Sequence, residues 1–178
     1  MDFIKSHNSF KSILENAEFS KNAVLNYLAK NPEVYKEAMD IVLYGEHPYA
    51  WRAGWVMGNY FEQNDKRLNP YIDTIIEMVE NSNPDGLQRE LLRLLLLSEF
   101  DEEKAGRIVD ICLSIWESTK KQASPRIIAL KILVKYSDKY TDLKPELIAL
   151  TEVDGFVNRS GAARSTQIIR NKLIEVII

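Results

Sequence analysis

Apolar residues recur at the spacing of an α-helix along almost the whole chain. In the stripe from Ile72 to Val79 they occupy positions i, i+3, i+4 and i+7, which lie on one face of a helix. No comparable segment alternates apolar and polar residues with the period of a strand. The pattern therefore predicts an all-α fold, and only the β-branched end from Leu173 to Ile178 leaves a strand open.

Turn residues and helix-start signals separate the apolar stripes at short intervals. Examples are the pairs Asn31-Pro32, Asn69-Pro70 and Ser124-Pro125, where proline is tolerated in a first helical turn. These breaks divide the chain into about ten helices. The predicted helices span roughly residues 9–15, 20–30, 33–44, 48–63, 70–80, 84–99, 101–119, 125–135, 145–152 and 157–172.

From residue 32 onward, the predicted helices form pairs that repeat. The apolar residues at the centres of the first helices recur about every 36 residues, and a second series in the second helices gives nearly the same period. The first series is Ile41, Ile75, Ile111 and Leu147, and the second is Trp51, Gln88, Arg126 and Arg159. One amphipathic helix pair cannot bury both its faces, whereas a stack of pairs can, so the period predicts an α-solenoid.

The second helices begin alike, with a turn residue, then a basic residue, then a small or aliphatic residue where helices pack closely. The four segments are Pro48 to Trp55, Pro84 to Arg93, Pro125 to Lys131 and Val157 to Arg164. They resemble the HEAT-repeat family, whose units are two-helix pairs of about 40 residues. The resemblance implies one armadillo-like, right-handed α–α superhelix over residues 1–178. It comprises about four helix pairs in 32–178 and a helical cap in 1–31.

The resemblance also implies that the second helices line a concave face and that the protein is a non-enzymatic scaffold that binds other proteins. The net charge is −3, yet the second helices carry more basic than acidic residues. A basic concave face attracts an acidic partner. Alternatively, these basic residues have no binding role and form a structural ladder of charges between repeats. The predicted binding residues are Trp51, Arg52, Arg89, Arg93, Arg126, Lys131, Arg159 and Arg164.

Two tryptophans belong to an aromatic cluster in the second helix of the first pair. Trp55 occupies an aliphatic repeat position, so we expect it in the core. Trp51 aligns with Gln88, Arg126 and Arg159, which we expect to be exposed. Trp51 therefore either anchors a partner or is covered by the N-terminal cap.

Sequence motifs for catalysis are missing. The glycines form no phosphate-binding loop, and His7 and His47 are too far apart in the sequence for a common zinc motif. Cys112 lies on an apolar stripe and is expected in the core. We therefore predict no cofactor and no metal. The single cysteine and the missing signal-peptide pattern favour the cytoplasm, and no apolar run approaches the ~20 residues needed to cross a membrane.

Two alternatives stay open. The chain has a weaker similarity to the HEAT-like alkylpurine DNA glycosylases, which implies a nucleic-acid-binding or DNA repair protein, although an acidic chain argues against that class of partner. The apolar C-terminus from Leu173 to Ile178 could instead join two copies as a homodimer.

Overall fold

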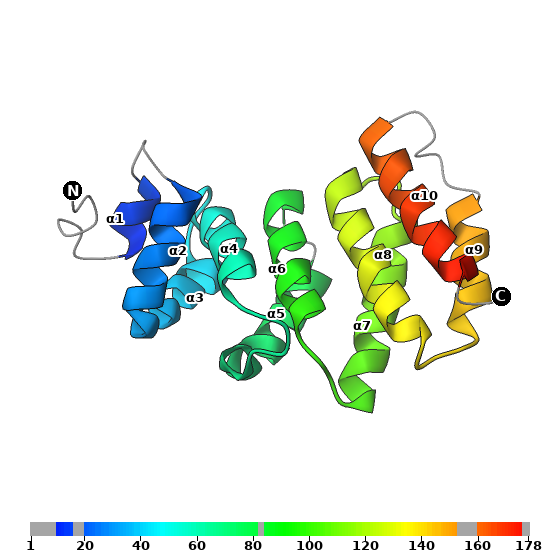
Figure 1. Cartoon of the computed structure of the whole chain (residues 1–178), viewed down its shortest axis with the longest axis horizontal. Helices are drawn as coiled ribbons and strands as arrows, with labels where there is room; N and C mark the ends of the chain where they lie inside the picture. The colour runs from blue at the N-terminus through cyan, green and yellow to red at the C-terminus, as the bar shows by residue number, and fades with distance from the viewer. Residues whose placement is uncertain (1–9, 16–19, 82–83, 153–159, 176–178) are drawn as a thin grey trace. The chain divides into compact units, whose positions relative to one another are not determined.

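The computed structural model describes residues 10–15, 20–81, 84–152 and 160–175 of the chain (Figure 1). The described residues form ten α-helices and two short 3-10 helices, and no strand occurs among them. The predicted all-α fold is therefore confirmed. The chain divides into two compact units, Met1–Ser98 and Glu99–Ile178. One domain over residues 1–178 stays a prediction.

The first unit holds two helix pairs and the two N-terminal helices. α3 packs against α4 and α5 against α6, while α4 lies along α6 and α3 touches α5. The second helices α4 and α6 thus form one layer and the first helices another. The elements are α1 (Phe10–Glu15), α2 (Lys21–Lys30), η1 (Pro32–Val34), α3 (Tyr35–Tyr44), α4 (Tyr49–Tyr60), η2 (Lys66–Tyr71), α5 (Ile72–Glu80) and α6 (Asp85–Leu97).

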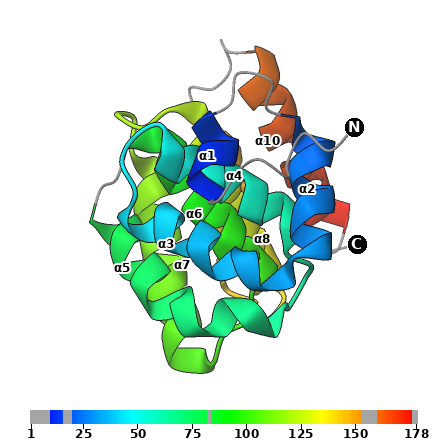
Figure 2. The same ribbon diagram turned by 90° about the vertical axis from the view of Figure 1, so that its left-hand side faces the viewer.

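The N-terminal helices α1 and α2 both pack on α4, and α1 also reaches α3 (Figure 2). Phe10 and Leu14 of α1 and Leu28 of α2 are fully buried. α1 and α2 thus bury their apolar side chains against the first pair, and their role as a cap stays a prediction.

The second unit holds two further pairs. These are α7 (Glu102–Glu117) with α8 (Ala123–Ser137), and α9 (Leu143–Glu152) with α10 (Ser160–Glu175). α8 lies beside both α9 and α10, so the second helices α8 and α10 are again neighbours (Figure 1). Because α10 continues to Glu175, the strand alternative is wrong for Leu173–Glu175, and the last three residues lie outside the described part.

The predicted stripe from Ile72 to Val79 lies in the core, whereas Ile41 and Ile111 at the centres of two other first helices are half-buried. Ile75, Ile76 and Val79 of α5 are at most 1% exposed, as are Leu91, Leu92 and Leu94 of α6. Cys112 is fully buried in α7, as expected, and this burial raises the pKa of its thiol. Among the described helices, none is both long enough and apolar enough to span a bilayer.

Arg67 fixes the connection between α4 and α5. Its Nη2 lies 2.6 Å from Asp65 Oδ2, and its Nη1 donates a 2.9 Å hydrogen bond to the Tyr60 hydroxyl. The guanidinium also lies within 5.5 Å of three ring centroids, those of Tyr35, Tyr60 and Phe61. Such cation–π contacts add to the ion pair. The hydrogen bonds from Arg67 hold the pKa of Asp65 below its ordinary value.

The lowered pKa of Asp65 predicts a pH-dependent stability. Its ion pair stabilises the fold above the ordinary carboxyl pKa, and that contribution is lost as the pH falls through the lowered value. Asp65→Asn keeps a side-chain cap on the Arg67 amide, so it removes mainly the charge. We expect the free energy of unfolding of the wild type to exceed that of this variant by about 1 kcal/mol near neutral pH. The gap should begin to narrow below about pH 4 and vanish once the pH is below the lowered pKa of Asp65. Urea unfolding at a series of pH values measures the gap, and a gap that does not change with pH would contradict the prediction.

Candidate interaction surface

Each unit has its own second-helix face, which is the side of α4 and α6 away from α3 and α5 in the first unit and the side of α8 and α10 away from α7 and α9 in the second. All the predicted binding residues that the structure describes come from these four helices. Arg159 lies outside the described residues. The other seven fall into four groups by their contacts. Arg52 and Arg126 bond to other helices, Arg89 and Arg93 surround a buried carboxylate, Trp51 lies beside the N-terminal helices, and Lys131 and Arg164 are exposed.

Three residues of the second helices make the same backbone contact. Arg52, Gln88 and Arg126 are each the fourth residue of their helix. Each donates a hydrogen bond to the carbonyl of the penultimate residue of a neighbouring helix, which is the N-terminal helix α1 for Arg52, α5 for Gln88 and α7 for Arg126. The pairs are Arg52 Nη1 to Leu14 at 3.0 Å, Gln88 Nε2 to Val79 at 2.9 Å and Arg126 Nε to Trp116 at 2.6 Å.

This contact explains why two expected exposures are wrong. Carbonyls in the last turn of a helix have no partner within the helix, so a side chain from a neighbouring helix can supply one. Gln88 is 1% exposed and Arg126 is 8% exposed because they reach those carbonyls. Arg52 takes the same place, counted from the start of its helix, but its carbonyl partner lies in α1 and not in α3, the first helix of its pair.

Arg126 also stacks on the helix that it contacts, with its guanidinium 5.3 Å from the ring centroid of Trp116. We expect Arg126→Met to lower the free energy of unfolding by about 2 kcal/mol, because a buried carbonyl loses a charged donor. Lys120→Met, at an exposed position between α7 and α8, should change it by less than about 0.5 kcal/mol. Urea denaturation followed by circular dichroism measures both, and equal effects would contradict the assignment.

Arg89 and Arg93 surround a buried carboxylate. Glu90 is fully buried, with its Oε1 2.7 Å from Arg89 Nε and its Oε2 2.9 Å from Arg93 Nη1. Arg93 Nη2 also donates to the carbonyl of Gly58 in α4 at 3.3 Å. The two arginine side chains remain 33% and 27% exposed. One carboxylate between two guanidinium groups leaves a cluster of positive charge that is partly open to solvent.

The two tryptophans of α4 lie beside the N-terminal helices. Trp51 is half-buried, which fits the packing of α1 and α2 on α4. Trp55, which was expected in the core, is also half-buried, and Lys21 of α2 lies 5.8 Å from its ring centroid. The cap therefore reaches the aromatic surface of α4. Whether Trp51 anchors a partner stays a prediction.

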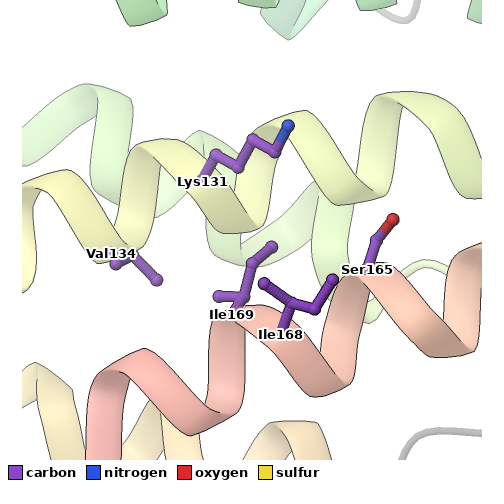
Figure 3. A pocket seen from close by; sticks show the side chains of 5 residues that line it. All are labelled: Lys131, Val134, Ser165, Ile168 and Ile169. Carbon is purple, nitrogen blue, oxygen red and sulfur yellow. The ribbon is translucent and has the colours of Figure 1, made fainter. Parts of the chain in front are cut away.

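Lys131 and Arg164 differ from the other predicted cations because both are exposed. Neither forms an ion pair with any of the described residues. Lys131 borders a groove of about 370 Å³ between α8 and α10, together with Val134, Ser165, Ile168 and Ile169 (Figure 3). Arg164 precedes Ser165, and it lies on the same helix face as Ile168, four residues later.

The groove offers apolar surface beside positive charge. Ile169 is 8% exposed and lines the groove, whereas Ile168 is 52% exposed, which is unusual for a large apolar side chain among the described residues. This volume is at the low end of ligand pockets, which span about 300–1,000 Å³. No cluster of His, Cys, Asp or Glu able to hold a metal ion occurs in the described part of the chain. The arrangement suits binding by burial and charge attraction.

Sequence reasoning missed the apolar lining of this groove. The sequence gives no local signal for it, because adjacent apolar residues in these helices can both be buried, as Ile75 and Ile76 are. Placing Val134 opposite them needs the packing of α8 on α10, which local spacing does not contain.

Comparison with known families agrees with the repeat seen in the two units. The family model described as HEAT repeat domain matches residues 11–173, which is nearly the whole chain. The match begins in α1 and ends in α10, so it includes the N-terminal helices as well as the pairs. Neither the curated proteins nor the solved structures give a match.

Proposed function

Because the chain belongs to the HEAT repeat family, we propose that it is a non-enzymatic scaffold whose second-helix face binds an acidic protein partner. A helical repeat scaffold of this kind commonly serves protein interaction.

The observation that carries the proposal is the exposure of Lys131, which lines a largely apolar groove, and of Arg164, which directly precedes the lining residue Ser165. An exposed cation beside apolar surface favours a partner that brings a carboxylate, because the pair loses part of its solvent screening on contact. The chain as a whole has a net charge of −3, so this positive surface is local and directs an acidic partner to one face.

The cluster of Arg89, Glu90 and Arg93 gives the second-helix face of the first unit positive charge of its own. It carries one excess positive charge, and both arginine side chains are partly exposed. Arg52 and Arg126 contribute differently, since each is held by a backbone carbonyl inside the fold. Their proposed role is to hold the second helices in place, and direct contact with a partner falls to Lys131 and Arg164.

The test is a charge reversal with a matched control. Lys131→Glu/Arg164→Glu should abolish binding of the partners captured from a lysate of the source cells, because two attractive contacts become repulsive. Lys36→Glu/Lys120→Glu makes the same change in net charge at exposed positions outside the second helices. Capture by this control should match wild type. Quantitative mass spectrometry of the captured proteins measures both.

Three results would count against the proposal. One is recovery of the same proteins by both reversed variants, and another is a set of captured proteins with no acidic segments. The third is binding of duplex DNA that weakens steeply as salt is raised, since this is the signature of a nucleic-acid protein. Circular dichroism of both variants checks that their helix content is unchanged.

A further inference from the structure

We propose that the groove between α8 and α10 is a docking site for an acidic amphipathic helix, which places an aliphatic side chain against Ile168. This inference rests on the proposed function and adds the form of the partner. It starts from the five residues that line the groove, namely Lys131, Val134, Ser165, Ile168 and Ile169.

Spacing places the lining residues on two facing ridges. Lys131 and Val134 are three residues apart on α8, while Ser165, Ile168 and Ile169 occupy i, i+3 and i+4 on α10. In Figure 3 the side chains of Ser165 and Ile169 point from α10 toward α8. Two parallel ridges with apolar residues between them match the apolar stripe of a third helix.

The backbone of the groove favours a helical partner over an extended one. Lys131, Ser165 and Ile168 lie in helix interiors, where amides and carbonyls are already bonded within the helix. An extended peptide would therefore find no main-chain partners for its own amides and carbonyls along these residues. A helix brings those groups already satisfied, so it can bury side chains in the groove without that cost.

Charge determines the flanks of the docked helix. Lys131 lies on the α8 side of the groove and Arg164 on the α10 side, and both are exposed. If the apolar stripe of a docked helix contacts Ile168, the residues on either side of that stripe would lie close to these two cations. Glutamate or aspartate at those positions forms pairs across the groove, whereas lysine would be repelled.

The test selects partners without assuming a natural one. A display library of random peptides about twelve residues long, enough for an i, i+3, i+4, i+7 stripe, is panned on the full chain. We expect enriched peptides with aliphatic residues at helical spacing and acidic residues beside them. Fluorescence anisotropy then measures their affinity for wild type, Ile168→Ser, Lys131→Glu and Tyr44→Ser. The last variant is the control, because Tyr44 is 75% exposed in α3.

Ile168→Ser should weaken binding of the selected peptides by about tenfold or more, and Tyr44→Ser should leave it unchanged. A proline in the middle of a peptide should abolish binding, because it breaks the helix. If the enriched peptides are acidic but have no apolar stripe, and if they bind Ile168→Ser as tightly as wild type, this inference is overturned while the proposed function stands. Apolar peptides unaffected by Lys131→Glu would overturn the acidic partner itself. Tolerance of proline would overturn the helical form.

Discussion

Gly54→Ala is expected to lower the free energy of unfolding by about 2–3 kcal/mol, within the range for overpacking a close-packed core. A Cβ at this position would lie 2.8 Å from Glu90 Cβ, an atom fixed to the backbone of α6. No flexible side chain can move aside, so α4 and α6 would have to separate. Alanine normally stabilises a helix relative to glycine by about 1 kcal/mol, and a loss here would show that helix contact outweighs propensity.

Gly58→Ala is the matched control, four residues further along the same helix. Its Cβ would lie 3.5 Å from the guanidinium carbon of Arg93, an ordinary contact with the end of a flexible side chain. We therefore expect no loss, or a gain of up to about 1 kcal/mol from helix propensity. Urea unfolding of both variants measures the contrast. Equal destabilisation by the two substitutions would mean that α4 and α6 do not cross closely at Gly54.

The helices and their pairing were predictable because local spacing specifies them. The stripe from Ile72 to Val79 is buried as its i, i+3, i+4 pattern requires. The start of α5 was less accurate, since Lys66–Tyr71 forms a 3-10 helix before Ile72. Tight turns of this kind commonly precede an α-helix, and the proline at position 70 fits either form.

The role of the arginines was harder to predict, because charge type in the sequence does not reveal the partner. Arg126 reads as a basic residue in a second helix, yet its donor meets the carbonyl of Trp116, ten residues earlier. That contact depends on how α7 and α8 pack. Lys131 has the same charge, is exposed and borders a groove. Only the fold separates a cation that holds helices together from one that can meet a partner.

Glu90 contacts two arginines that could serve either role. We expect Glu90→Ala to lower the free energy of unfolding by about 2–3 kcal/mol. Removing one member of a buried ion pair typically costs about 3–5 kcal/mol. The loss should be smaller here, because Arg89 and Arg93 are 33% and 27% exposed and can turn toward solvent. Glu77→Ala, at an exposed position in α5, is the control and should change stability by less than about 0.5 kcal/mol.

The same variant separates structure from binding in the first unit. Losing the Glu90 carboxylate removes the anion between two guanidinium groups, so the second-helix face becomes more positive. If that face attracts an acidic partner, Glu90→Ala should bind it no more weakly than wild type at temperatures where both are folded. Stability and affinity would then change independently. Loss of binding in step with loss of stability would show instead that the arginines matter only for holding α6 against α4.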